Sequence, residues 1–125
     1  MVSKASIAPW LSVRNVKESL EFYLAAFGAT EVYRLEDDTG KPVVAHLSIN
    51  EADFWIQEDL NCNFESASRG FFRMILTVEN PDWVFQQALL AGADKVSDVS
   101  DDHGWRIGHL IDPFGYHWEI GKPIN

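Results

Sequence analysis

Two stretches of the sequence, Leu11-Ser-Val-Arg-Asn15 and Leu76-Thr-Val-Glu-Asn80, share one pattern that decides the fold. Each is a short apolar segment that ends in Asn. Each is followed by an amphipathic segment that ends at a glycine, in Phe27-Gly-Ala29 and in Ala91-Gly-Ala93. A strand, a capping Asn, a helix and a terminating Gly therefore occur twice in the same order. This repetition predicts two copies of one supersecondary unit.

The first copy is predicted to contain one helix and four strands. Asn15 suits the N-cap position, Glu18 three residues later suits a capping box, and Gly28 ends the helix of residues 16–27. Alternation in the first strand places Ala8 and Trp10 on one face of the sheet. The strands are expected at residues 7–13, 30–35, 43–49 and 54–57.

The second copy repeats this order. Asn80 is the expected N-cap, Pro81 suits the first helical position, and Gly92 ends the helix. The strands are expected at residues 73–78, 95–99, 105–111 and 116–120, with Asp112-Pro-Phe-Gly115 as the last turn. The predicted class is therefore α+β, with two βαβββ modules. These modules are expected at about residues 5–58 and 71–122, joined by a linker at about residues 59–70.

Each helix is expected to cover one face of its own mixed sheet and to leave the other face open. The open faces are then expected to form an open barrel-like cavity, and a ligand should bind there. At 125 residues the chain is long enough for a single domain with its own core.

The composition narrows the possible partners. A net charge of −9 with scattered Lys and Arg residues argues against nucleic acid, and the longest apolar runs are too short to cross a membrane. The single cysteine, Cys62, cannot form an internal disulfide, and a cytoplasmic location is expected. The acidity favours a cationic ligand, and five Trp and eight Phe favour an aromatic one.

Three segments resemble one known superfamily. They are the strand-to-helix passage Leu11-Ser-Val-Arg-Asn-Val16, the helix end Glu21-Phe-Tyr-Leu-Ala-Ala-Phe-Gly28, and the closing hairpin Asp112-Pro-Phe-Gly-Tyr-His-Trp-Glu-Ile120. Together they resemble the vicinal oxygen chelate superfamily, which includes glyoxalase I, extradiol dioxygenases, fosfomycin-resistance enzymes and bleomycin-resistance proteins. The resemblance covers nearly the whole chain. It implies the fold more strongly than any reaction, because members carry out many chemistries.

The resemblance also implies where a metal would bind. In glyoxalase-like members the ligands lie on the first and last strands of each module, and these positions correspond here to Ala8, Gln57, Arg73 and Glu119. Only Glu119 is a good ligand, because Ala8 has no donor atom, Gln57 offers a neutral oxygen, and Arg73 is a permanent cation. We therefore expect no conventional metal site. We also expect an ion pair between Arg73 and Glu119, which share one cavity.

A different ligand set keeps metal chemistry open. Matching the modules through their turns makes Trp55 the counterpart of His117, and it leaves His46 and His109 one residue out of register, on opposite faces. His46, His117 and Glu119 are the remaining set that suits zinc, nickel, manganese or iron. His117 is alternatively a strand histidine with no chemical role.

Residues 103–106 have two possible roles. His103-Gly104-Trp105-Arg106 is either a lip over the cavity, with Trp105 stacking on a ligand and Arg106 holding an anion, or a turn whose Trp packs on the sheet edge.

The sequence thus favours a homodimeric, metal-independent small-molecule binding protein that sequesters a drug or metabolite, as bleomycin-resistance proteins do. The alternative is a metal-dependent, glyoxalase-like lyase, isomerase or dioxygenase that uses a rearranged ligand set. A metal-free enzyme with Glu119 as general base and Arg73 stabilising an oxyanion is also open. The expected ligand-binding residues are Trp10, Trp55, Gln57, Arg73, Trp105, His117 and Glu119.

Overall fold

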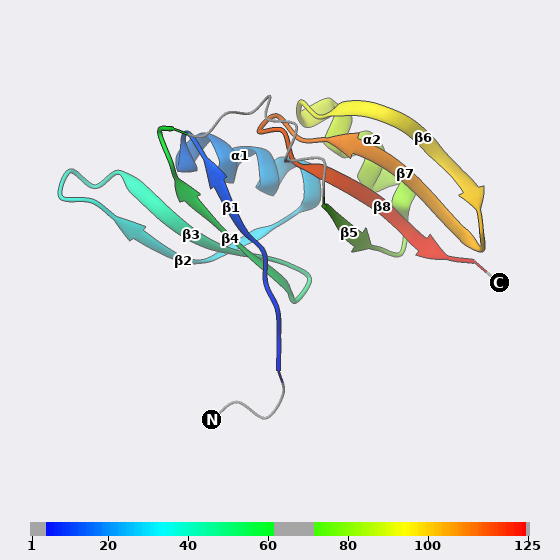
Figure 1. Ribbon diagram of the computed structural model, residues 1–125, viewed down its shortest axis with the longest axis horizontal. Helices are drawn as coiled ribbons and strands as arrows, with labels where there is room; N and C mark the ends of the chain where they lie inside the picture. Colours follow the sequence, from blue (N-terminus) through cyan, green and yellow to red (C-terminus); the bar gives the residue numbers. More distant parts are fainter. Residues whose placement is uncertain (1–4, 62–71, 125) are drawn as a thin grey trace. The chain divides into compact units, whose positions relative to one another are not determined.

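The computed structural model describes residues 5–61 and 72–124, which form two compact units (Figure 1). The first unit holds the first four strands and most of the first helix. The second holds the other four strands, the second helix and residues 25–27. Most of the predicted linker, including Cys62, lies outside the described residues.

The first unit has the order βαβββ. Its elements are β1 (Trp10–Val13), α1 (Val16–Phe27), β2 (Thr30–Glu36), β3 (Pro42–Ile49) and β4 (Ala52–Glu58). The sheet order is β1-β4-β3-β2, in which β1 is parallel to β4 and the other pairs are antiparallel. This is the mixed sheet predicted from the sequence.

The helix α1 has the predicted bounds because its caps are strong. The backbone N–H of Glu18 donates to Asn15 Oδ1 at 2.9 Å, and Gly28 has a φ of +67° that favours glycine. In contrast, β1 begins at Trp10 and not at Ile7. The backbone N–H of Trp55 donates to the Pro9 carbonyl at 2.8 Å, whereas Ile7 is 98% exposed. The predicted strand was therefore too long at its start.

The second unit repeats the same order. Its elements are β5 (Arg73–Thr77), α2 (Pro81–Ala91), β6 (Asp94–Asp102), β7 (Trp105–Ile111) and β8 (His117–Pro123). The sheet order is β5-β8-β7-β6, again with a parallel first pair. Asn80 caps α2 by accepting from the Trp83 N–H at 3.2 Å. The predicted α+β fold with two βαβββ modules is confirmed.

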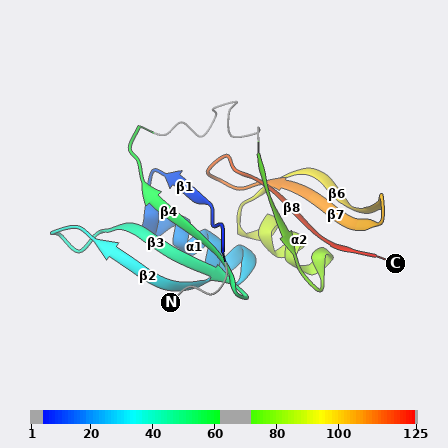
Figure 2. The same cartoon turned by 60° about the horizontal axis from the view of Figure 1, so that its bottom comes forward.

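In each unit the helix covers one face of its own sheet (Figure 2). In the first unit Leu11, Leu47 and Ile56 are buried on the side of α1, and Tyr23 of α1 meets Phe54 edge to face with ring centroids 5.1 Å apart. In the second unit Phe85 of α2, Leu110 and Ile120 are buried. Alternate residues on the other face of each sheet are half-buried or exposed. The predicted cavity depends on how the two open faces meet, and it stays a prediction.

Among the described residues, no helix is both long and apolar enough to cross a membrane.

Candidate functional site

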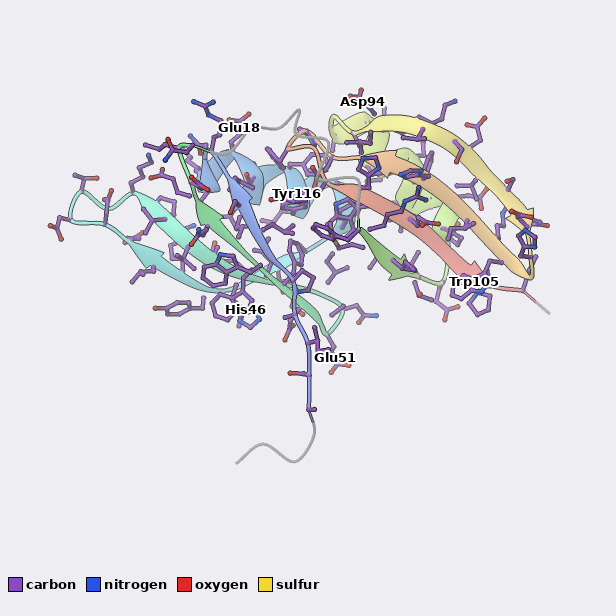
Figure 3. All side chains as sticks on the ribbon, in the orientation of Figure 1. Glu18, His46, Glu51, Asp94, Trp105 and Tyr116 are labelled. Carbon is purple, nitrogen blue, oxygen red and sulfur yellow. The ribbon has the colours of Figure 1, made fainter. Side chains whose placement is uncertain are left out.

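The open face of the first sheet carries a row of four aromatic side chains, one from each strand. Trp10 of β1 lies opposite Trp55 of β4, Trp55 lies opposite His46 of β3, and His46 lies opposite Tyr33 of β2. Residues directly opposite on neighbouring strands share a face and touch. We call Trp10, Trp55, His46 and Tyr33 the aromatic row; His46 is labelled in Figure 3.

The rings of the aromatic row are packed on one another. Trp55 stacks on Trp10 with centroids 5.8 Å apart and on His46 with centroids 4.3 Å apart, at interplanar angles of 20° and 9°. Tyr33 meets Trp55 edge to face at 6.3 Å. Trp10 is 53% exposed and Tyr33 is 51% exposed, so both ends of the row are open to solvent. Such a surface suits a planar ligand, because ring stacking adds to apolar burial.

Polar groups lie beside this row. Gln57 is half-buried and lies opposite both Ser12 and Val44, one row along the sheet. Asp53 lies on the same strand and face as Trp55, and its Oδ2 is 3.5 Å from His46 Nε2. That nitrogen is buried and forms no hydrogen bond with the described residues.

The open face of the second sheet is polar. Arg73 lies opposite His117 in the strand register, and His109 lies opposite Glu119. Arg73 Nη1 donates to Glu119 Oε2 at 3.1 Å, and His109 Nε2 lies 2.8 Å from His117 Nδ1. One imidazole of that pair must donate and the other accept. We call Arg73, His109, His117 and Glu119 the polar cluster.

The surroundings of His109 favour its neutral form. Burial lowers the pKa of His109 below its ordinary 6.5, the positive charge of Arg73 and the neighbouring His117 lower it further, and Glu119 opposes them in part. The polar cluster therefore contains one charged pair and one histidine that resists protonation. These groups can donate and accept hydrogen bonds and can exchange a proton.

His109 lies on the open face of the second sheet, opposite Glu119, contrary to the expectation from the sequence. His109 was expected one residue out of register with His46, and hence on the other face. The β3–β4 turn has two residues, with Ile49 opposite Ala52, whereas five residues separate Ile111 from its partner His117. Because of the longer loop, Ile111 is the counterpart of His46 in the second sheet. His109 lies two residues before Ile111 on β7, so it is on the same open face.

Asp112 holds this longer loop in place. Its Oδ1 accepts from the N–H groups of Phe114 and Tyr116, both at 2.9 Å, and its Oδ2 accepts from Trp118 Nε1 at 2.9 Å. The Asp112 side chain is almost fully buried, since the residue is 2% exposed. A buried carboxylate is stable there because three donors compensate its lost hydration.

Residues 103–106 form a turn and the first residues of β7, and the stacking of Trp105 on a ligand stays a prediction. His103 and Gly104 form a two-residue turn with φ values of +51° and +82°, and Trp105 starts β7 opposite Pro123 (Figure 3). Trp105 is half-buried on the open side, two rows from His109. Arg106 points to the helix side, where its guanidinium binds Asp82 of α2 at 2.6 Å and Asp101 at 2.9 Å. Arg106 is thus engaged within the unit.

The four positions implied for a metal do not fit one. The predicted ion pair of Arg73 and Glu119 is present, so a cation occupies the carboxylate that a metal would need. Ala8 is exposed and has no donor atom. Within residues 5–61 and 72–124, no three His, Cys, Asp or Glu side chains are grouped to hold a metal ion. The rearranged set of His46, His117 and Glu119 draws on both units and stays a prediction.

Three residues of these faces were not among the predicted site residues: Tyr33, Asp53 and His109. Tyr33 follows an irregularity in β2, where the register shifts between Glu31 and Tyr33, so simple alternation does not locate it. Asp53 lies two residues before Trp55 on β4, so strand alternation is the signal that could have located it on that face. Placing His109 on the open face required the length of the loop between β7 and β8.

Comparison with known proteins identifies the class. The model of the Glyoxalase-like domain family matches residues 10–121 of the chain. The protein therefore belongs to the Glyoxalase-like domain family, within the superfamily that its sequence resembles.

The chain has relatives in mycobacteria. It is 34% identical over 128 residues to the uncharacterized protein Mb0911c of Mycobacterium bovis, covering 96% of this chain and 84% of that protein. It is equally similar to the uncharacterized protein Rv0887c of Mycobacterium tuberculosis, of which it covers 75%.

Solved structures agree on the fold. TioX from Micromonospora sp. ML1 superposes with a TM-score of 0.76 at 20% identity, covering 97% of this chain and 100% of TioX. The fosfomycin resistance protein FosX from Listeria monocytogenes superposes with a TM-score of 0.75 at 17% identity, covering 98% and 95% of the two chains. At these identities the likeness concerns the fold alone.

Proposed function

We propose that the protein binds a planar aromatic drug or metabolite on the aromatic row and sequesters it without a metal. The observation that carries this proposal is the stack of Trp10, Trp55 and His46, which is continued by Tyr33 and open to solvent at both ends. Stacking on such rings needs neither a metal nor a covalent step. The ligand would extend the existing ring contacts.

Two further features support this proposal. Proteins of this superfamily use open sheet faces for their sites, and the aromatic row lies on such a face. Metal chemistry would instead need carboxylate or imidazole ligands, and Glu119 is the one such ligand at the four positions that the resemblance implies. An antibiotic-sequestering role, as in bleomycin-resistance proteins, is one form that this function can take.

A second candidate function is enzymatic. The polar cluster brings His109 and His117 within 2.8 Å of each other beside Glu119 and Arg73, and these groups are suited to proton transfer. A metal-dependent, glyoxalase-like lyase, isomerase or dioxygenase would instead take its ligands from His46, His117 and Glu119. Elemental analysis of the purified protein tests this candidate, because a stoichiometric zinc, nickel, manganese or iron content would favour it.

Tryptophan fluorescence tests the binding proposal. Acridine, a planar aromatic probe, is titrated into the wild-type protein and into the variants Trp10→Leu and Trp55→Leu. We expect saturable quenching in the wild type and a weaker affinity, by about ten-fold, in either variant, since an aromatic contact contributes about 0.5–1.5 kcal/mol beyond its buried area.

The matched control is Trp83→Leu, because Trp83 is 63% exposed on α2 and lies outside the row. Equal affinity in all three variants, or no saturation in the wild type, would overturn the proposal. The homodimer implied by the resemblance is a separate proposal, which light scattering after size-exclusion chromatography would test.

A further inference from the structure

We infer that Asp53 gives the aromatic row a preference for cations, so that the ligand is a planar aromatic cation rather than a neutral ring. This inference rests on the proposed function and names the chemical class of its ligand. It derives from the charges of one sheet face and is independent of the net charge of the chain.

The carboxylate of Asp53 is well placed for this role. Asp53 and Trp55 are alternate residues of β4, so their side chains leave the same face of the sheet. Asp53 Oδ2 lies 3.5 Å from His46 Nε2, and the His46 ring is stacked on Trp55 at 4.3 Å. The carboxylate thus stands at the edge of the ring stack. Its side chain is 49% exposed, which leaves it accessible to a ligand.

No fixed positive charge of the described first unit competes for Asp53. Arg34 lies opposite Ala45, on the helix side, and binds Glu31 at 2.6 Å. Lys41 binds Glu58, which lies opposite Val13 on the helix side. The remaining basic residues of this unit lie after β1 or in α1, and they are Arg14 and Lys17. Among the described residues, the ion-pair partner of Asp53 is His46, which is itself a member of the aromatic row.

Aromatic faces and a carboxylate favour the same kind of ligand. The face of a Trp ring attracts a cation, by about 0.5–1 kcal/mol at an exposed site and more when water is excluded. A half-exposed carboxylate adds a similar small amount. Together they predict that a cation binds about five-fold to ten-fold more tightly than a neutral ring of the same shape.

The test compares two probes of nearly equal shape, N-methylacridinium and acridine, in mildly basic buffer in which acridine is uncharged. We expect the wild type to bind N-methylacridinium about five-fold to ten-fold more tightly than acridine. In Asp53→Asn this ratio should fall to about two-fold to three-fold, the share due to the Trp faces, because the carboxylate charge is lost while the shape is kept. The affinity for acridine should stay unchanged.

The control is Asp98→Asn, which removes the same charge from an exposed position on β6 of the other unit. It should leave the ratio as in the wild type. If both probes bind equally to the wild type, or if Asp98→Asn lowers the ratio as much as Asp53→Asn, the inference is overturned and the proposed function stands. If neither probe binds to the wild type, the proposed function fails with it.

Discussion

The two open sheet faces have the same topology and different chemistry. In the first unit, four aromatic rings line up across β1, β4, β3 and β2, with Trp55 at the centre. In the second, the corresponding strands carry the polar cluster, in which His117 takes the place of Trp55 and Glu119 that of Gln57. A duplicated fold thus provides two faces, of which one suits ring stacking and the other hydrogen bonding. The difference begins with single residues and with the length of one loop.

The largest loss of stability is expected when the hydrogen bonds that hold the loop between β7 and β8 are removed. Replacing Asp112 by Ala removes three hydrogen bonds to a buried carboxylate, and we expect the free energy of unfolding to fall by about 3 kcal/mol. Urea unfolding followed by circular dichroism measures it. Asp98→Ala is the control, since that side chain is 77% exposed, and a loss no greater than in this control would refute the role of Asp112.

The next effect tests whether the aromatic row is a single packed unit. In a double-mutant cycle of Trp10→Ala and Trp55→Ala, we expect a coupling of about 1 kcal/mol between the two stacked rings. Urea unfolding of the two single variants and the double variant provides the value. Strict additivity would mean that the rings do not support each other.

A smaller effect of opposite sign is expected in the short turn of the first unit. Asn50 and Glu51 have φ values of +49° and +75°, a conformation that glycine adopts more readily than glutamate. Glu51→Gly should therefore stabilise the protein by about 0.5–1 kcal/mol. Glu51→Ala keeps the strained backbone and should change thermal stability little. An equal gain in both variants would show that the backbone is not the cause.

The smallest effect concerns pH and the polar cluster. The pKa of His109 is lowered on folding, so the unfolded chain takes up the proton more readily below pH 6.5. The stability due to neutral His109 is present above that pH and is lost as the pH falls toward the lowered pKa. Replacing His109 by Gln should flatten this decline in urea unfolding on either side of pH 6.5. A decline as steep as in the wild type would place its origin elsewhere.

The sequence predicted the parts of the fold that local rules govern. Asn15 and Gly28 bound α1 as expected, because a cap and a left-handed glycine act within one turn. Alternation correctly placed Trp10 and Trp55 on one face and His117 and Glu119 on another. These predictions needed no knowledge of tertiary packing.

The failures concern register, which local rules do not determine. His109 was misplaced because the loop after Ile111 is three residues longer than the turn after Ile49, and only strand pairing reveals this. In one of the two interpretations of residues 103–106 Arg106 holds an anion, but Asp82 of α2 binds it across a separation of 24 residues. The spacing of apolar and polar residues along the chain does not reveal such contacts between distant segments.

NMR of the five tryptophan indole N–H groups during a titration with N-methylacridinium tests whether the aromatic row of the first unit holds the ligand. Each signal is assigned with a single Trp→Phe variant. We predict saturable shifts of the Trp10 and Trp55 signals and none of the Trp83 signal. Shifts confined to Trp83 or Trp105, with Trp10 and Trp55 unchanged at saturation, would contradict the account.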